Sequence, residues 1–432
     1  MKIQPAKRIN GQLRVPGDKS ITHRVAMIAA LADGVSQIAN FSTSFDCAST
    51  LTCLEQLGVA VERSGQQVTI AGRSRFVRPS DPLDCGNSGS TIRMMAGVLA
   101  GQDFPSELTG DESLSSRPMR RIIEPLELMG AQIHSRDGKP PLRITGTNSL
   151  RPISYTLPMA SAQVKSCVLF AGLGTKGVTS VIESQQSRNH TELLFNGFGV
   201  PVSTENVPNG KVISLNGPAR FNARDLTVPG DISSAAYFVA AAALLPGSDL
   251  TIDLVGLNPT RAEYLSLLES WGVQLRTSEL HHECNEPVGT VQVRGCLDGG
   301  SRVTEAELSG ATIPLVIDEL PLLAVVGTQL EGGLRIRDAR ELRVKETDRL
   351  AATAKNLKAM GAEVDEYEDG LFVAGPTNLQ GAQLDSFGDH RIAMAFAVAA
   401  LFANGPSEIS DAQCVEISFP EFFDLLHSIS EH

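Results

Sequence analysis

Two alternating patterns of apolar residues run along the chain. In the first, an apolar residue, two variable residues, an apolar residue and a glycine are followed by alternating apolar positions. This pattern predicts an amphipathic helix that ends at a glycine C-cap, followed by a strand with one buried face. It occurs around Gly58, Gly130, Gly199, Gly272 and Gly361.

The second pattern is an Ala-rich, almost entirely apolar helix that begins with Ser or Asp and ends near a glycine. Helices that are apolar on all sides are typically buried, so the amphipathic helices should lie outside them. Residues 422–426 are expected to supply the outer helix of the last unit, and residues 2–5 a strand of the same domain. Six buried helices are predicted, at 20–34, 90–101, 161–174, 233–247, 318–332 and 389–405.

A turn near the N-terminus is copied in the second half of the chain. Residues 15–18 (Val-Pro-Gly-Asp) recur as residues 228–231, and each copy precedes a predicted buried helix. The duplication groups the six units as three plus three. We therefore predict an α/β protein of two similar domains, one formed by residues 14–221 and the other by 1–13 together with 222–432.

The two copies of the turn differ in charge. Lys19 and Arg24 follow the first turn, whereas Ile232 and Tyr237 occupy the matching positions after the second. Ser20 can cap the first helix, whose free amides attract anions. These features predict an anion site at the start of the first helix. The alternative is a capped helix whose charges are solvated.

The overall composition limits the classes of partner. The 432 residues carry a formal net charge of −12, which disfavours nucleic acid or an anionic membrane. The seven cysteines form no C-x-x-C pair, so reduced thiols are expected rather than disulfides or a zinc site. The first residues lack the apolar core of a signal peptide, and we expect a cytoplasmic protein.

Other polar stretches at predicted helix starts are candidates for ligand contacts. A glycine-rich turn at 85–93 would let backbone amides approach a ligand closely. Arg117 precedes Pro118, which predicts a helix start. Ser161 and Gln163 offer hydrogen bonds to hydroxyl or phosphate oxygens. Each stretch is equally compatible with a helix cap or a solvated loop.

Carboxylates and cations also cluster in the second half. Asp318 and Glu319 open an apolar helix, either to complement its dipole or with Asp318 as a general base. Lys345 and Arg349 are four residues apart and are expected on one helical face, although a solvated ion-pair helix would have the same pattern. Arg391 heads an apolar helix, where burial favours an anionic partner.

Four stretches, 16–24, 86–89, 343–349 and 389–391, strongly resemble motifs of the enolpyruvyl transferase family. The match is best to members that act on shikimate 3-phosphate, and it covers nearly the whole chain. The resemblance implies two domains, each an inside-out α/β barrel of three β-α-β-α-β-β repeats around buried helices, with the active site in the cleft between them. It also implies transfer of the enolpyruvyl group of phosphoenolpyruvate to the 5-hydroxyl of shikimate 3-phosphate, in the shikimate pathway to chorismate and aromatic amino acids.

The resemblance also assigns roles to residues. Asp318 is the expected base for the 5-hydroxyl, Glu346 the acid that protonates the methylene carbon, and Lys19 a catalytic cation between the substrates. No metal or cofactor is implied, and the chain is expected to be a monomer. Shikimate 3-phosphate is expected to contact Lys19, Ser20, Arg24, Ser161, Ala162, Gln163, Asp318 and Lys345. Phosphoenolpyruvate is expected to contact Lys19, Gly89, Arg117, Gln163, Arg349 and Arg391.

Two positions bear on the phosphoenolpyruvate site. Ile417 stands where many relatives carry a lysine before Phe-Pro, so one phosphoenolpyruvate contact is expected to be missing or replaced. Gly89 is the small residue that leaves room for glyphosate, a mimic of phosphoenolpyruvate, so inhibition by glyphosate is expected to be sterically possible.

Three alternative functions are weighed against enolpyruvyl transfer to shikimate 3-phosphate. Relatives that use UDP-N-acetylglucosamine usually carry a reactive cysteine shortly before the Arg-Pro pair, and residues 111–117 contain none. An RNA 3′-phosphate cyclase shares a related repeat but would need a basic surface. A non-catalytic anion-binding scaffold would keep the arginines and lysines but would not need Asp318 and Glu346.

Overall fold

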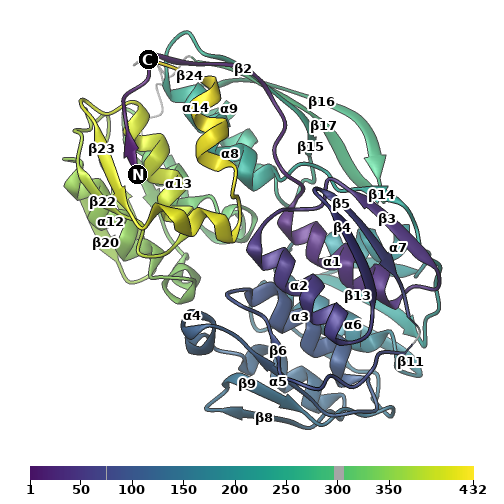
Figure 1. Ribbon diagram of the computed structural model, residues 1–432. Helices are drawn as coiled ribbons and strands as arrows, with labels where there is room; N and C mark the ends of the chain where they lie inside the picture. Colours follow the sequence, from purple (N-terminus) through teal and green to yellow (C-terminus); the bar gives the residue numbers. More distant parts are fainter. Residues whose placement is uncertain (74, 296–305) are drawn as a thin grey trace. The chain divides into compact units, whose positions relative to one another are not determined.

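The computed structural model describes residues 1–73, 75–295 and 306–432, and these form two compact units (Figure 1). Unit 1 contains residues 1–16, 230–281 and 287–432, and unit 2 contains residues 17–229 and 282–286. Cys296, one of the seven cysteines, lies outside the described residues. The predicted mixed α/β class is confirmed.

Unit 2 is built from three sheets, each with one parallel pair of strands and two antiparallel pairs. The first sheet has the order β14-β3-β5-β4, with β3 (Val35–Ala39), β4 (Ala60–Ser64), β5 (Gln67–Ala71) and β14 (Leu226–Thr227). The second is β6-β7-β9-β8, with β6 (Leu83–Asp84), β7 (Ser106–Thr109), β8 (Ile133–Arg136) and β9 (Lys139–Ile144). The third is β10-β11-β13-β12, with β10 (Ser154–Thr156), β11 (Gly177–Glu183), β12 (Val202–Val207) and β13 (Gly210–Gly217).

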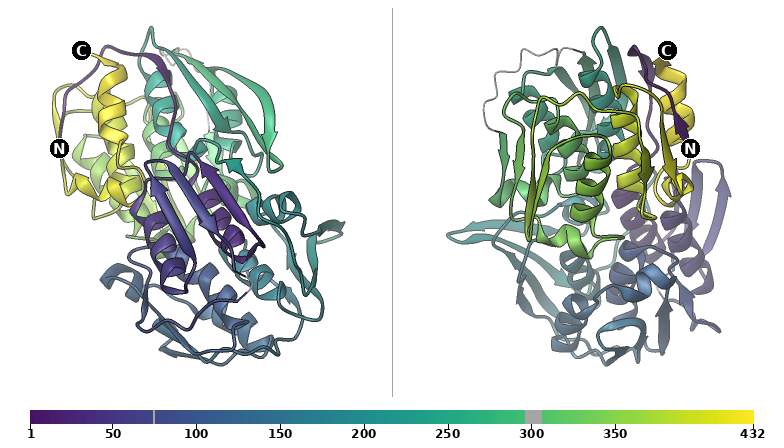
Figure 2. Two further views of the ribbon diagram at one scale, coloured as in Figure 1. Left: turned by 45° about the vertical axis from the view of Figure 1, so that its right-hand side comes forward. Right: turned by 90° about the vertical axis from the view of Figure 1, so that its left-hand side faces the viewer.

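The helices of unit 2 fall into an inner and an outer set. The inner helices are α1 (Lys19–Leu31), α3 (Gly89–Ala100) and α6 (Ala162–Gly172), which pack together in the core. In the left view of Figure 2, the purple strands of the first sheet lie in front of α1. The remaining helices are α2 (Phe45–Gln56), α4 (Glu112–Ser116), α5 (Arg120–Leu128) and α7 (His190–Gly197).

The described residues of unit 1 also form three sheets. The first has the order β16-β17-β15-β2-β24, with β2 (Arg8–Leu13), β15 (Asp249–Gly256), β16 (Gln274–Glu283), β17 (Glu286–Arg294) and β24 (Ser430–Glu431). The second is β18-β19-β21-β20, with β18 (Ala306–Leu308), β19 (Leu334–Ile336), β20 (Val364–Tyr367) and β21 (Gly370–Val373). The third is β1-β23-β22, with β1 (Lys2–Ile3), β22 (Gln383–Asp385) and β23 (Ser407–Ser410).

Three helices of unit 1, α8 (Ile232–Leu244), α11 (Leu320–Gly327) and α13 (His390–Leu401), are buried along their whole length and pack together. The outer helices include α14, which confirms the helix predicted at 422–426, and β1 confirms the N-terminal strand. The other helices of this unit are α9 (Glu263–Ser270), α10 (Ile313–Val316), α12 (Arg349–Ala359), α14 (Phe422–Ile429) and the 3₁₀ helices η1 (Gly310–Thr312), η2 (Arg340–Val344) and η3 (Ala412–Ile417).

The first sequence pattern is confirmed, because its glycine follows the end of a helix in each case. The glycines that follow α2, α5, α7, α9 and α12 all have φ between +82° and +100°. In this left-handed region a side chain is unfavourable, and the amides of these glycines bond back into the helix that they end. Each helix can therefore reverse directly into the following strand.

Three predicted helix caps were wrong by two residues. Asp18, not Ser20, caps α1, and Ser88, not Ser90, caps α3. Asp231, not Ser233, caps α8. In each case the earlier side chain accepts a hydrogen bond from a free amide of the first turn, so the helix starts sooner.

The borders of the units follow the strand pairing. The chain passes from unit 1 to unit 2 between residues 16 and 17 and returns to unit 1 between residues 229 and 230. The borders expected from the sequence were 13/14 and 221/222. Strand β14 pairs in parallel with β3, which keeps residues up to 229 in unit 2. In unit 1, β2 pairs in parallel with β15.

Within the described residues, no single helix has the length and apolar character needed to cross a bilayer. The pair Gly310–Val316 and Leu320–Gly327, bent by 110°, passes that test only when the two segments are taken together.

Gly97 in α3 offers a test of the inner packing of unit 2. A Cβ atom at this position would lie 2.1 Å from the backbone oxygen of Cys167 in α6. We expect Gly97→Ala to lower the free energy of unfolding by about 1–3 kcal/mol, as measured by urea denaturation. Gly101→Ala is the matched control, because its Cβ would meet only Leu150 at 3.7 Å. Equal stabilities of the two variants would contradict this packing.

Candidate active site

In unit 2, Lys19 begins α1 and forms an ion pair. Its Nζ lies 2.9 Å from Oδ2 of Asp46 in α2, and the two side chains are 16% and 10% exposed. The thiol of Cys47 lies 3.7 Å from the Lys19 carbonyl oxygen. Burial raises the pKa of Cys47 to about 12, so this thiol stays neutral. The carboxylate of Asp46 therefore fixes the position of the ammonium group.

Arg24 lies one turn further along α1 and is buried. It donates to the backbone oxygen of Ser20 at 2.7 Å, to Oγ1 of Thr191 at 2.8 Å and to Oγ of Ser166 at 3.0 Å. Ser166 lies in α6 and Thr191 in α7. Neutral oxygens therefore hold the guanidinium of Arg24 and join three helices.

A chain of buried hydroxyl groups starts at His23. Nδ1 of His23 lies 2.7 Å from Oγ1 of Thr50, which is 2.7 Å from Oγ1 of Thr91, and Thr91 donates to Ser88 at 2.8 Å. Burial, together with the charges of Lys19 and Arg24, holds the pKa of His23 well below its ordinary value of 6.5. His23 is therefore neutral and links the second turns of α1 and α2 to the first turn of α3.

Gly89, Arg117 and Gln163 come together around Arg93. Arg93 Nη1 donates to Oε1 of Gln163 at 2.8 Å, and Gln163 Nε2 donates to Ser90 at 2.9 Å. A Cβ atom on Gly89 would lie 2.7 Å from Arg93 Nη1 and 3.3 Å from Arg117 Nη1. A larger residue at position 89 would require the Arg93 guanidinium to shift and would crowd that of Arg117.

Arg117 ends α4, so the predicted helix start at Pro118 was wrong, and α5 begins at Arg120. Its Nη2 donates to Oδ1 of Asn87 at 2.6 Å, and Asn87 donates to Asp111 at 2.7 Å. Asp111 also caps α4. The cap, the amide and the guanidinium form one hydrogen-bonded series.

Ser161 and Ala162 lie at the start of α6. Ser161 is the N-cap, as predicted, and its hydroxyl accepts from the Val164 amide at 3.4 Å. Ala162 is the first helical residue. The amides of this first turn have no partner one turn earlier within the helix, so they favour an anion.

In unit 1, Arg349 is the first residue of α12 and contacts three carboxylates. Its Nε donates to Asp389 at 2.7 Å, its Nη2 to Glu346 at 2.7 Å and its Nη1 to Asp318 at 3.2 Å. Burial alone would lower the pKa of Arg349, but the three carboxylates raise it above its ordinary value. The side chain therefore stays charged and brings both expected acid–base residues together.

Arg391, the second residue of α13, lies beside the same group. Its Nη2 is 3.8 Å from Oδ2 of Asp318, and its Nη1 is 3.6 Å from Oε1 of Glu319. Its side chain is 8% exposed. Burial would lower the pKa of Arg391, whereas Tyr237, Asp318 and Glu319 raise it overall. Arg391 is thus a buried cation close to Asp318.

The expectation that Lys345 and Arg349 share a helical face was wrong. Lys345 follows η2 in an extended conformation, and α12 begins only at Arg349, because Asp348 accepts from the Ala351 amide as its N-cap. Lys345 Nζ lies 3.6 Å from Oε1 of Glu341. The described contacts therefore place Lys345 beside Glu341 and do not join it to Arg349.

Asp318 does not start its helix as predicted. Glu319 is the N-cap of α11, and its side chain makes no capping hydrogen bond. Ile417 ends η3 and packs against the apolar core of unit 1, so its side chain supplies no cation where many relatives carry a lysine.

The sequence analysis did not predict Asp46 as a site residue, and it included Asn87 and Arg93 only as members of the turn at 85–93. Asp46 lies in the first turn of α2, where an acidic residue usually complements the helix dipole. Its contact with Lys19 depends on the packing of α1 against α2, which local sequence does not specify.

The model of the family described as EPSP synthase (3-phosphoshikimate 1-carboxyvinyltransferase) matches residues 3–426. The chain belongs to the EPSP synthase family. The 3-phosphoshikimate 1-carboxyvinyltransferases of Koribacter versatilis and Solibacter usitatus are 49% and 50% identical to it over 435 and 434 residues. Both alignments cover 100% of this chain and 99% of the relative. The resemblance inferred from the motifs is confirmed.

Solved structures agree with this family. EPSP synthase from Acinetobacter baumannii superposes with a TM-score of 0.86 at 39% identity, covering 99% of this chain and 98% of that one. The enolpyruvyl transferase NikO from Streptomyces tendae gives a TM-score of 0.78 at 18% identity, covering 99% and 96%. At that low identity NikO supports the fold alone.

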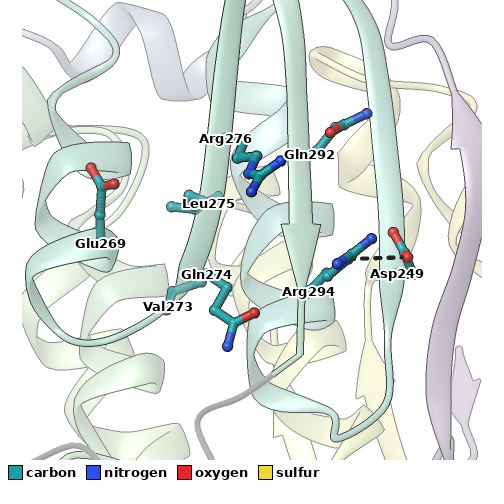
Figure 3. A pocket seen from close by; sticks show the side chains of 8 residues that line it. All are labelled: Asp249, Glu269, Val273, Gln274, Leu275, Arg276, Gln292 and Arg294. Carbon is teal, nitrogen blue, oxygen red and sulfur yellow. Dashed lines mark ion pairs between the residues drawn. The ribbon is translucent and has the colours of Figure 1, made fainter.

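A pocket of about 540 Å³ lies elsewhere in unit 1, over β16 and β17 (Figure 3). The ion pair drawn in Figure 3 joins Arg294 to Asp249 at 3.4 Å, and these side chains are 72% and 60% exposed. None of the expected site residues, all of which the structure describes, lines it. Among the described residues no group of three or more His, Cys, Asp or Glu is arranged to hold a metal ion.

The lowered pKa of His23 predicts a pH effect on stability. Below pH 6.5 the unfolded chain binds a proton at this residue that the folded chain does not. Stability should therefore fall as pH drops from 6.5 towards the folded pKa, by about 1.4 kcal/mol per pH unit. His23 contributes no pH dependence above that window.

We expect His23→Gln to flatten this part of the profile in urea denaturation at pH 5 to 8. His281→Gln, at an exposed position, is the matched control and should keep the wild-type slope. Parallel profiles for wild type and His23→Gln would contradict the buried neutral imidazole.

Proposed function

We propose that this chain transfers the enolpyruvyl group of phosphoenolpyruvate to the 5-hydroxyl of shikimate 3-phosphate and releases phosphate. Membership of the EPSP synthase family supports the reaction. The observation that carries the chemistry is Arg349, a buried cation in contact with both Asp318 and Glu346. A base and an acid held by one guanidinium are suited to a reaction that removes one proton and adds another.

The residues of unit 2 suit a phosphorylated hydroxy acid. We assign shikimate 3-phosphate to Ser20, Arg24, Ser161, Ala162 and Gln163, with Asp318 and Lys345 from unit 1. Hydroxyl groups, an amide and free helix amides match the hydroxyls and phosphate oxygens of that substrate.

Phosphoenolpyruvate carries a carboxylate and a phosphate, which suit arginine. Planar guanidinium groups bind both anions in a bidentate manner. We assign this substrate to Lys19, Gly89, Arg117 and Gln163 of unit 2 and to Arg349 and Arg391 of unit 1. Ile417 adds no cation to this set.

The proposed reaction is an addition followed by an elimination. Asp318 accepts the proton of the 5-hydroxyl while the hydroxyl oxygen bonds to C2 of phosphoenolpyruvate. Glu346 protonates C3, which becomes a methyl group. In the second step the C2–O bond to phosphate breaks, and the Glu346 carboxylate, which lost its proton in the first step, takes a proton from the methyl group, so that the C2–C3 double bond is restored. Cations near the phosphate stabilise the charge that develops as it leaves.

The proposal also covers the location and the oligomeric state of the chain. We propose that the chain acts as a cytoplasmic monomer, which light scattering after gel filtration tests directly for the oligomeric state. No cofactor enters the proposed reaction.

Asp318→Asn tests the role of the base. The amide has the same shape but cannot accept the hydroxyl proton, so we expect kcat to fall by about 10²- to 10⁴-fold in a phosphate-release assay with both substrates. Asp365→Asn, at an exposed position in β20, is the matched control and should retain wild-type rates. A near-normal kcat for Asp318→Asn would refute this role, and turnover with UDP-N-acetylglucosamine in place of shikimate 3-phosphate would refute the proposed acceptor.

Gly89→Ala tests the space beside the arginines. We expect glyphosate to compete with phosphoenolpyruvate in the wild type, because Gly89 leaves both guanidinium groups accessible. The added methyl group would displace Arg93 or Arg117, so it should raise both the KM for phosphoenolpyruvate and the inhibition constant for glyphosate by about tenfold or more. Gly174→Ala, whose Cβ would meet only Ala171 O at 3.9 Å, is the control. Full wild-type activity in saturating glyphosate would defeat the proposal.

A further inference from the structure

Glu319 is a buried carboxylate whose place in the structure has no local explanation. Its side chain is 1% exposed and lies at the N-cap of α11, yet it makes no capping hydrogen bond. Among the described residues, neither of its carboxylate oxygens has a hydrogen-bond donor within range. A carboxylate that loses its water without gaining hydrogen bonds destabilises the fold.

Asp389 shows how a buried acid of the same unit is normally satisfied. It is also fully buried, but it accepts from Arg349 Nε at 2.7 Å and from the Arg391 amide at 2.8 Å. Asp389 therefore stabilises α12 and α13 directly. Glu319 makes no comparable hydrogen bond, so these contacts do not give it a stabilising role like that of Asp389.

Glu319 forms an ion pair with the guanidinium of Arg391. The 3.6 Å between Glu319 Oε1 and Arg391 Nη1 allows attraction without a hydrogen bond. Asp318 lies 3.8 Å from Nη2 on the same guanidinium, and the Nε of Arg391 is buried without an acceptor among the described residues. Two consecutive carboxylates thus attract Arg391 without accepting hydrogen bonds from it, and its Nε keeps a hydrogen bond to donate.

Arg349 provides the contrast. Its nitrogens donate to Asp389, Glu346 and Asp318 at 2.7 to 3.3 Å. Arg349 is therefore held by hydrogen bonds to three acids, whereas Arg391 has a side-chain hydrogen bond with Tyr237 and only longer charge contacts with Asp318 and Glu319. A guanidinium held in that way can still donate its hydrogen bonds to an entering anion.

We propose that Glu319 is a positioning residue that orients Arg391 for phosphoenolpyruvate without touching either substrate. The inference rests on the proposed function, in which Arg391 binds phosphoenolpyruvate. The negative charge of Glu319 is the essential property, because its shape alone provides no hydrogen bond to Arg391. Glu319 lies beside Tyr237 and Tyr264, whose pKa values are raised by burial and, more weakly, by its charge.

The test measures the KM for each substrate in Glu319→Gln, which keeps the shape and removes the charge. We expect the KM for phosphoenolpyruvate to rise about tenfold, while the KM for shikimate 3-phosphate and the thermal midpoint stay close to wild type. Glu319→Asp keeps the charge at a longer distance from Arg391 and should restore part of the affinity. Glu331→Gln, at an exposed position of the same unit, is the matched control.

A double-mutant cycle with Arg391→Lys separates positioning from general stability. If Glu319 acts through Arg391, adding Glu319→Gln to Arg391→Lys should raise the phosphoenolpyruvate KM by less than about twofold. Additive effects, equal rises in both KM values, or unchanged KM values in folded Glu319→Gln would overturn the inference. If Glu319→Gln does not fold, a wild-type phosphoenolpyruvate KM in Glu319→Asp would also overturn it. A wild type without turnover would refute the proposed function as well, whereas an active wild type beside unaffected variants would refute the role of Glu319 alone.

Discussion

The buried helices of this chain carry many of its polar groups at or near their N-terminal ends. In unit 1, α8, α11 and α13 have no exposed residue, and their N-terminal ends carry Asp231, Glu319 and Asp389. In unit 2, the hydroxyl chain from His23 joins α1 and α2 to the first turn of α3. The free amides of these turns require polar partners, so the constraint that builds the core also gathers the chemistry.

The unit 1 cluster is held together by the mutual dependence of its charges. Removing one partner from a buried pair of this kind would leave an uncompensated charge, which is strongly unfavourable. Arg349 meets this need with hydrogen bonds to three acids, and those acids include the residues assigned as base and acid. Stability and reactivity therefore depend on the same guanidinium, and the looser contacts of Arg391 are the exception that suits a ligand.

The sequence predicted the helices and their order better than it predicted contacts. The six buried helices and the glycine stops follow from local periodicity and are present. Lys345 and Arg349 were expected on one helical face because of their spacing, but Asp348 starts α12 after Lys345. The pairing of Lys19 with Asp46 depends on two helices that meet in space, and no spacing rule reveals it. Motif resemblance supplied the roles that periodicity could not.

The duplicated turn shows how one scaffold acquired two chemistries. In unit 2 the Asp18 amide donates to the Pro229 oxygen at 2.8 Å, and in unit 1 the Asp231 amide donates to the Pro16 oxygen at 2.9 Å. Both aspartates cap the helix that follows, so the turn has kept its structural role in each copy. After the first turn α1 carries cations, whereas α8 is buried and apolar, and unit 1 has its arginines on α12 and α13 instead. Because capping needs only the turn itself, the following helical positions were free to diverge into a polar site in one unit and a packed core in the other.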